Sequence, residues 1–291
     1  MVRRILLSAA VLLVTIFTPL QADATSGTYA ALGDSVAAGA GLSGGTAPCF
    51  QSPESYGYTV SNMTGLPFHH LACTGAKADD GLYGDQARDG FILPAQLKQA
   101  FEGGTPSLIS ITIGANDARW TQFIRQCYYI TCGYGIDTAR YAAYLADLKL
   151  ELNVIMAKIH TLSSGTPPQV IVTGYYQPLS TTVCNDTAGL TTNEISWLRA
   201  RTNALNNAIS GTVAKYSYAK YAPVDFAGHE LCSNDPWIQS PAQGAPFHPT
   251  AAGQAAIANA VFEKYTNPAP PVETRSYRER LLDWFRQYGD W

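Results

Sequence analysis

Short apolar segments rich in β-branched residues alternate with long helical segments along most of this chain. Residues 107–113 read Ser-Leu-Ile-Ser-Ile-Thr-Ile, and residues 169–175 have a similar character, which is typical of strands buried on both faces. Between them, residues 139–162 repeat apolar side chains at a spacing of three and four, which predicts a helix with one apolar face. This alternation predicts an α/β, three-layer sandwich, with a central parallel sheet covered by helices on both faces.

The other predicted elements complete the alternation. They are a strand from Thr28 that runs into Gly33, strands at 68–72 and 221–225, and helices at 53–64, 94–101, 191–216 and 249–265. The helix predicted at 191–216 begins with Thr191-Thr-Asn-Glu194, which has the pattern of a capping box.

Residues capable of chemistry follow the predicted strands. Ligands of such sheets bind where the carboxyl ends of the strands meet, and Ser35, Gly75 and Asn116 each follow a predicted strand. Gly33 permits a tight turn, after which Ser35 can open a helix whose free N–H groups face the same space as its hydroxyl. Because an ordinary turn has the same sequence, the hypothesis of a nucleophilic Ser35 depends on its neighbours at the other strand ends.

A nucleophilic serine needs a base, and His248 is the best candidate. It stands in the loop 245–253, just before the last predicted helix, where Pro249 suits the first helical turn. Structural positions are expected for the other histidines, which are His69, His70, His160 and His229.

Acyl transfer also needs donors for the oxyanion. The backbone N–H groups of Ser35 and Gly75 and the carboxamide of Asn116 are the candidates, and the loss of one such donor typically costs about a hundredfold in rate. The alternative for Gly75 and Asn116 is a purely structural turn. Residues 41–45 also match the G-x-S-x-G elbow of α/β-hydrolases, but neither a strand precedes them nor a helix follows, so a loop beside the site is predicted.

The first residues have the pattern of a secretory signal peptide. Arg3 and Arg4 precede the apolar stretch 5–20, and Ala22-Asp-Ala24 fits a cleavage site. We therefore expect a signal peptide at 1–24 and an extracellular mature protein, the alternative being an anchor that is retained. No other stretch is long and apolar enough to cross a bilayer.

Six cysteines in an exported chain predict three disulfides. The residues alone favour a local bridge between Cys127 and Cys132 and leave the rest of the pairing open. Since the chain contains no Cys-x-x-Cys and no histidine pair with helical ligand spacing, we expect no metal and no other cofactor.

Charge and the C-terminal residues bear on partners. The formal net charge is −3 with no basic patch, which argues against nucleic acid as a partner. Residues 267–291 are predicted to be a linker and a tail with one aromatic stripe, either a docked or frayed helix or an amphipathic surface binder for lipid or cell envelope. A monomer is expected.

Four sequence blocks carry a resemblance to a known family. Gly33-Asp-Ser35, Gly75, Gly114-Ala-Asn116-Asp117 and His248-Pro-Thr-Ala-Ala-Gly253 resemble, in order, the blocks of the GDSL or SGNH hydrolases. The resemblance covers roughly residues 28–264, and the motifs 72–76, 228–232 and 235–237 and the six cysteines are similar to the secreted bacterial lipase/esterase branch. It implies a flavodoxin-like fold in a hydrolase domain at 25–266, with Ser35 as nucleophile, Gly75 and Asn116 as oxyanion donors and His248 as base.

The resemblance also implies a disulfide pairing and exposes one departure. The implied bridges are sequential, Cys49–Cys73, Cys127–Cys132 and Cys184–Cys232. Most of the family has an aspartate three residues before the histidine, where this chain has Ala245. Some members of the branch orient the histidine with a backbone carbonyl, which implies a Ser–His dyad with the carbonyl of Ala245. Asp235 is the alternative partner, and Asp34 is expected to be a structural hydrogen-bonding residue.

These patterns together predict a secreted serine ester hydrolase. Its expected substrates are acyl esters of a lipid or a small alcohol, cleaved through an acyl-enzyme. One alternative keeps the site and changes the reaction to carbohydrate deacetylation or acyl transfer. The other is a non-catalytic surface-binding module.

Overall fold

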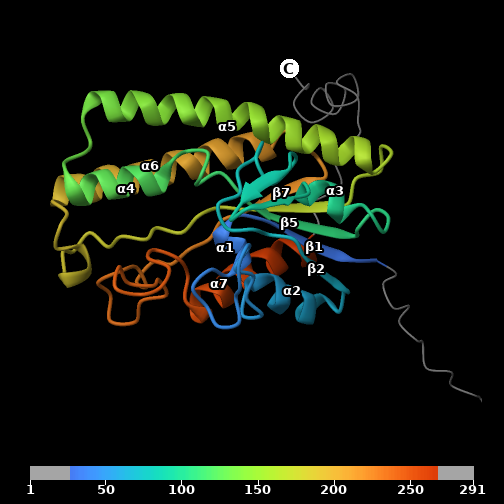
Figure 1. Ribbon diagram of the computed structural model, residues 1–291, viewed down its shortest axis with the longest axis horizontal. Helices are drawn as coiled ribbons and strands as arrows, with labels where there is room; N and C mark the ends of the chain where they lie inside the picture. The colour runs from blue at the N-terminus through green and yellow to red at the C-terminus, as the bar shows by residue number, and fades with distance from the viewer. Residues whose placement is uncertain (1–26, 268–291) are drawn as a thin grey trace, which may run out of the picture.

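The computed structural model describes residues 27–267, whose centre is a five-stranded parallel sheet (Figure 1). The strands lie in the order β2-β1-β5-β6-β7, which is the flavodoxin-like order 2-1-3-4-5 when the strands of this sheet alone are counted. Their bounds are β1 Tyr29–Gly33, β2 Phe68–His70, β5 Leu108–Thr112, β6 Gln169–Thr173 and β7 Ala219–Ala222. The order reverses between β1 and β5, so a crevice opens at the carboxyl ends of these two strands.

Helices cover both faces of the sheet, as predicted. On one face lie α3 (Gln96–Ala100), α4 (Trp120–Tyr129), α5 (Gly135–Leu162) and α6 (Thr192–Val213) (Figure 1). On the other lie α2 (Tyr56–Thr64) and α7 (Ala251–Thr266), which pack against each other. Because both faces are covered, the central strands bury apolar side chains on each side, and Leu32, Ile111 and Ile171 are fully buried.

Several predicted boundaries were wrong by a few residues. The helix predicted at 139–162 begins at Gly135, because the buried carboxylate of Asp137 accepts the N–H groups of Gly133 and Tyr134 and so caps an earlier turn. The last strand lies at Ala219–Ala222 rather than 221–225. The capping box of α6 is confirmed, since Thr191 and Glu194 bond each other's backbone N–H.

The structure contains a hairpin that was not predicted from the sequence. Strands β3 (Gln86–Arg88) and β4 (Phe91–Leu93) pair antiparallel across Asp89 and Gly90, both with positive φ. Asp-Gly is the sequence pattern that favours such two-residue turns. Its flanking strands are only three residues long, too short for a periodic pattern to stand out.

Three disulfides hold the loops together: Cys49–Cys73, Cys127–Cys132 and Cys184–Cys232. This is the sequential pairing implied by the family resemblance. The predicted signal peptide at 1–24 and the tail after residue 267 lie outside the described residues. Among residues 27–267, no helix combines the length and apolarity needed to cross a membrane.

Candidate active site

Ser35 is the first residue of the short helix α1 (Ser35–Ala38), directly beyond β1. The turn between them needs glycine, because Gly33 has a φ of 134° and a Cβ there would lie 2.1 Å from the Thr112 carbonyl oxygen. The buried side chain of Gln96 holds this turn from the side. Its Oε1 accepts the Gly33 N–H at 2.7 Å, and its Nε2 donates to the Gly33 carbonyl at 3.0 Å.

Asp34 caps α1 and ties it to the next strands. Its Oδ1 accepts the Val36 N–H at 2.9 Å, and its Oδ2 accepts the hydroxyl of Tyr175 at 2.6 Å. Burial raises the pKa of Asp34 to about 7, although both hydrogen bonds act in the opposite direction. Asp34 therefore has the structural role that was expected of it.

His248 reaches back over the strand ends and meets Ser35. Its Nε2 lies 2.7 Å from the Ser35 Oγ, across 213 residues of sequence. The loop that carries it is held by backbone bonds to Gln239 and by the Tyr176 hydroxyl, which donates to the Phe247 carbonyl at 2.7 Å. Phe247 itself has a φ of 66°, an uncommon conformation for a bulky residue, immediately before the imidazole.

The second imidazole nitrogen faces the backbone of residues 245–246, where the predicted Ala245 and its neighbour Pro246 both present carbonyls to the imidazole. The Nδ1 of His248 lies 3.0 Å from the carbonyl oxygen of Pro246, whereas the carbonyl of Ala245 accepts the His248 backbone N–H at 3.2 Å. Burial lowers the pKa of His248, and the two carbonyls act against this shift. With Nδ1–H donating to Pro246, Nε2 carries the lone pair and can accept the proton of the Ser35 hydroxyl.

Asp235, the alternative partner for His248, is engaged elsewhere. Its carboxylate lies 3.3 Å from Nδ1 of His229 and accepts the indole N–H of Trp237. The His229 ring stacks on Trp237 at 3.6 Å between centroids. The geometry around His248 is therefore that of a Ser–His pair oriented by a backbone carbonyl.

The candidate oxyanion donors lie on the neighbouring loops. Gly75 has a φ of 83°. The carboxamide of Asn116 donates to the carbonyl of Ala76, the residue after Gly75, at 2.9 Å. Within residues 27–267, the backbone N–H groups of Ser35 and Gly75 have no protein acceptor. Free N–H groups of this kind are available to an oxyanion.

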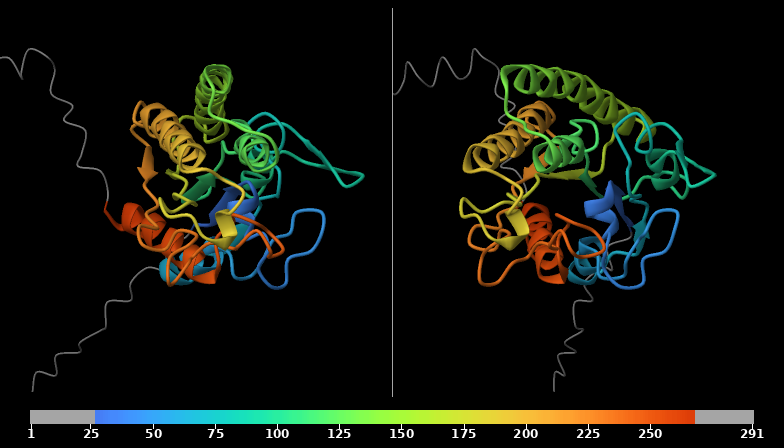
Figure 2. Two further views of the ribbon diagram at one scale, coloured as in Figure 1. Left: turned by 90° about the vertical axis from the view of Figure 1, so that its left-hand side faces the viewer. Right: turned by 60° about the vertical axis from the view of Figure 1, so that its left-hand side comes forward.

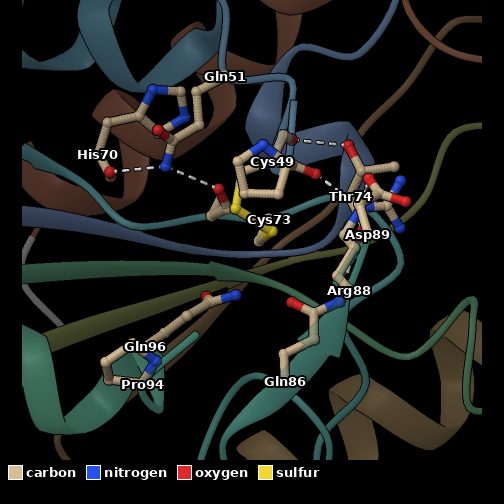
Figure 3. Close-up of a disulfide and its surroundings, with 12 residues drawn as sticks. Cys49, Gln51, His70, Cys73, Thr74, Gln86, Arg88, Asp89, Pro94 and Gln96 are labelled. Carbon is tan, nitrogen blue, oxygen red and sulfur yellow. Dashed lines mark hydrogen bonds and ion pairs between the residues drawn. A yellow bond between two sulfur atoms is a disulfide. The ribbon is translucent and has the colours of Figure 1, made fainter. Parts of the chain in front are cut away.

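The disulfide Cys49–Cys73 braces the loop that carries Gly75 (Figure 3). The hydroxyl of Thr74 donates to the Cys49 carbonyl at 2.8 Å, and the amide of Gln51 donates to the His70 carbonyl at 2.8 Å. The backbone N–H of Cys73 also bonds the Gly33 carbonyl at 3.0 Å. The loop is thereby fixed to the end of β1, beside Ser35.

A mainly apolar pocket opens onto this arrangement. Ser35, Asn116 and His248 line it. Its walls are formed by large, mostly apolar side chains: Trp120, Tyr175, Tyr176, Pro178, Leu205 and Phe247. Among residues 27–267, no cluster of His, Cys, Asp or Glu has the arrangement of a metal site.

Comparison with known proteins identifies the family of the chain. A model of the GDSL-like lipase/acylhydrolase family matches residues 31–256. The chain belongs to this family. This GDSL-like hydrolase is 30% identical to a lipase of Streptomyces rimosus over 239 residues, which are 78% of this chain and 82% of the relative. It is 29% identical to Lipase 1 of Streptomyces coelicolor over 78% of this chain and 82% of that lipase.

Two crystal structures share the fold of the GDSL-like hydrolase. The extracellular lipase of Streptomyces rimosus superposes with a TM-score of 0.68 at 28% identity, over 82% of this chain and 99% of that one. Phospholipase A1 of Streptomyces albidoflavus superposes with a TM-score of 0.64 at 26% identity, over the same shares. The protein is therefore a carboxylic ester hydrolase.

The residues that hold the site in place were not predicted from the sequence. They are Gln96, Tyr175 and Pro246, none of which belongs to a sequence motif. Gln96 and Tyr175 bond residues that are far away in the sequence. Pro246 acts through its backbone carbonyl, whose direction the sequence does not reveal. The G-x-S-x-G loop lies beside the site, as predicted. A Cβ on Gly41 would come within 2.5 Å of the Ala245 Cβ, so this loop packs against the residues that carry His248.

Proposed function

We propose that this GDSL-like hydrolase cleaves acyl esters of lipids or small alcohols through an acyl-enzyme on Ser35. The observation that carries the proposal is the 2.7 Å contact between Ser35 Oγ and His248 Nε2 at the mouth of an apolar pocket. A serine hydroxyl is weakly nucleophilic until a base removes its proton.

In the acylation step, His248 Nε2 takes the Ser35 proton as Oγ attacks the ester carbonyl carbon. The negative charge then lies on the carbonyl oxygen, which accepts hydrogen bonds from the Ser35 and Gly75 N–H groups and the Asn116 amide. The imidazolium returns its proton to the alcohol oxygen, the C–O bond breaks and the alcohol leaves. The acyl group remains bonded to Ser35.

In the deacylation step, water takes the place of the alcohol. His248 accepts a proton from the water, whose oxygen attacks the acyl carbon, and then returns the proton to Ser35 Oγ as the acid leaves. The Pro246 carbonyl keeps Nδ1–H in place throughout. A carbonyl stabilises the imidazolium less than a carboxylate would, so the oxyanion donors carry more of the transition-state stabilisation.

The substrate proposal rests on the walls of the pocket. Trp120, Leu205 and Phe247 offer apolar contacts suited to a hydrocarbon acyl chain, whereas sugars need a lining richer in polar groups. The names lipase and phospholipase A1 of the relatives support lipid esters. The intact Ser35–His248 contact supports an enzyme over a non-catalytic binding module.

We also propose that the protein acts outside the cell. Its three disulfides are stable in an oxidising compartment, and the Streptomyces rimosus lipase is extracellular by name. A monomer is the expected state in solution.

The proposal is tested with a series of p-nitrophenyl esters of increasing chain length. We expect Ser35→Ala and His248→Ala each to lose at least about a thousandfold in kcat, because removing either the nucleophile or its base costs about as much as removing both. The matched controls are Ser43→Ala in the G-x-S-x-G loop and His160→Ala at an exposed position of α5. Unchanged turnover in Ser35→Ala, or comparable loss in Ser43→Ala, would refute the assignment.

A further inference from the structure

Four large side chains stand exposed where α4 ends and α5 begins. Tyr129 is 81% exposed, Ile130 78%, Tyr134 61% and Ile136 60%. We call these four residues the 129–136 patch. Figure 1 places the end of α4 and the start of α5 together at one end of the molecule, and the left view of Figure 2 looks onto that end.

The patch lies on an uncharged stretch of chain. Residues 126–136 contain no Asp, Glu, Lys or Arg. The two carboxylates that accept hydrogen bonds from this stretch, Asp137 and Glu194, are buried, at 2% and 6% exposed. Two exposed arginines, Arg125 and Arg140, flank it. An apolar surface with cations at its margin is complementary to a lipid surface, where phosphate groups border hydrocarbon.

The backbone of this turn is already satisfied from within. The N–H of Cys132 donates to Glu194 at 3.1 Å, and those of Gly133 and Tyr134 donate to Asp137 at 3.1 and 3.2 Å. The Cys127–Cys132 disulfide closes the same turn. Entry into a medium of low dielectric constant therefore leaves these donors paired and orders little additional chain.

The patch is linked to the wall of the active-site pocket through one residue, Tyr128. Tyr128, the residue before it, packs against Phe247 at 6.1 Å between ring centroids, and Phe247 lines the pocket beside His248. A surface that rests on this patch thus lies next to the pocket. Tyrosine is suited to such a boundary, since its ring is apolar and its hydroxyl stays hydrated.

We propose that the 129–136 patch is the surface through which this protein adsorbs to phospholipid bilayers. The proposal extends the proposed lipid-ester hydrolysis, but adsorption needs no turnover and is measured separately from it. Ile130 and Ile136 supply the apolar contacts, Tyr129 and Tyr134 lie at the headgroup level, and Arg125 and Arg140 meet phosphates.

The test is co-sedimentation of the full chain with vesicles of pure dioleoyl phosphatidylcholine. A Ser35→Ala background keeps the lipid intact. We expect Ile130→Ser/Ile136→Ser to lower the partition coefficient about tenfold or more, because two apolar side chains lose their burial in the lipid. Ile130→Trp should raise it, since tryptophan favours the interface.

Matched controls separate this surface from others. Leu150→Ser/Leu162→Ser removes two exposed leucines from α5 outside the patch, and Ile92→Ser changes an exposed side chain of β4 in the β3–β4 hairpin. Both should adsorb like the parent. Full adsorption of Ile130→Ser/Ile136→Ser would overturn the proposal and assign binding to another segment, such as the C-terminal tail. So would a wild-type dimer in sedimentation velocity that this variant converts to monomer, because the patch would then be a contact between copies.

Turnover of a soluble short-chain ester, measured without vesicles and with Ser35 intact, keeps the two proposals apart. We expect Ile130→Ser/Ile136→Ser to retain wild-type turnover, which also shows that it folds. If this variant loses both adsorption and soluble turnover, the patch proposal fails, because the substituted side chains are then needed for the fold and not for a separate lipid-binding surface. If wild-type turnover does not depend on Ser35 while adsorption still depends on the patch, only the proposed function fails.

Discussion

Replacing Asp34 by asparagine should abolish a pH-dependent loss of stability that the wild-type protein carries. Asp34 is 1% exposed, and burial raises its pKa from 3.8 to about 7. Between these values the folded protein holds a proton that the unfolded chain has released. A raised pKa of an acid therefore means that stability falls as the pH rises through this window.

The size of the effect follows from the pKa. Each pH unit in which only the folded state is protonated costs about 1.4 kcal/mol of unfolding free energy. From pH 5 to pH 7 the wild-type protein therefore loses about 2 kcal/mol through this one group, because the folded-state carboxyl is half ionised at pH 7. At pH 5 Asp34→Asn should be less stable than wild type, because asparagine bonds Tyr175 less well. Since asparagine cannot ionise, its unfolding free energy relative to wild type should rise by about 3 kcal/mol between pH 5 and pH 8.

Urea denaturation at pH 5, 6, 7 and 8 measures this difference. Most other shifted groups are present in both proteins and cancel in the comparison. Asp117, whose own pKa burial raises to about 6, also raises the pKa of Asp34 and so contributes to the difference. Asp147→Asn, at an exposed position of α5, is the matched control and should follow the wild-type profile. A stability difference between Asp34→Asn and wild type that stays constant from pH 5 to pH 8 would show that the folded protein does not retain a proton on Asp34 in this range.

Three further predictions concern the base, the oxyanion site and a disulfide. Because burial lowers the pKa of His248, the acidic limb of kcat/KM for a soluble ester should have its midpoint below 6.5, and a midpoint above it would contradict the dyad. Asn116→Ala should lower kcat about a hundredfold with little change in KM; a change in KM alone would assign Asn116 to substrate binding instead. Removing Cys49–Cys73 by Cys→Ser at both positions should cost about 3 kcal/mol in urea denaturation, more than the about 2 kcal/mol expected for Cys127–Cys132, because the bridges close loops of 24 and 5 residues. The reverse order would contradict the loop-entropy argument.

The sheet could be predicted from the sequence because its strands are short, β-branched and buried on both faces. Ile109 and Ile111 are fully buried between two layers of helices, which leaves an uninterrupted apolar run in the sequence. Ser35 and Asn116 could be found for a related reason. They follow such runs directly, and parallel strands bring their carboxyl ends to one edge.

The supports of the site could not be predicted, because they depend on contacts between distant residues. Tyr175 bonds Asp34 across 141 residues, and Gln96 bonds Gly33 across 63. Which carbonyl bonds the imidazole, that of Ala245 or that of Pro246, is instead a local question. Both carbonyls lie in the same turn, and the Nδ1 of His248 lies 3.0 Å from that of Pro246. Nothing in the residue types encodes that direction.

The proposed mechanism depends on Ser35, activated by His248, as the nucleophile. Reaction with a fluorophosphonate, followed by mass mapping of the peptides, tests it most directly because the reagent bonds an activated serine. We expect one adduct, on Ser35, that is absent from Ser35→Ala and forms much more slowly in His248→Ala. An adduct on another residue, such as Ser43, or full ester turnover by a protein whose Ser35 is blocked, would contradict it.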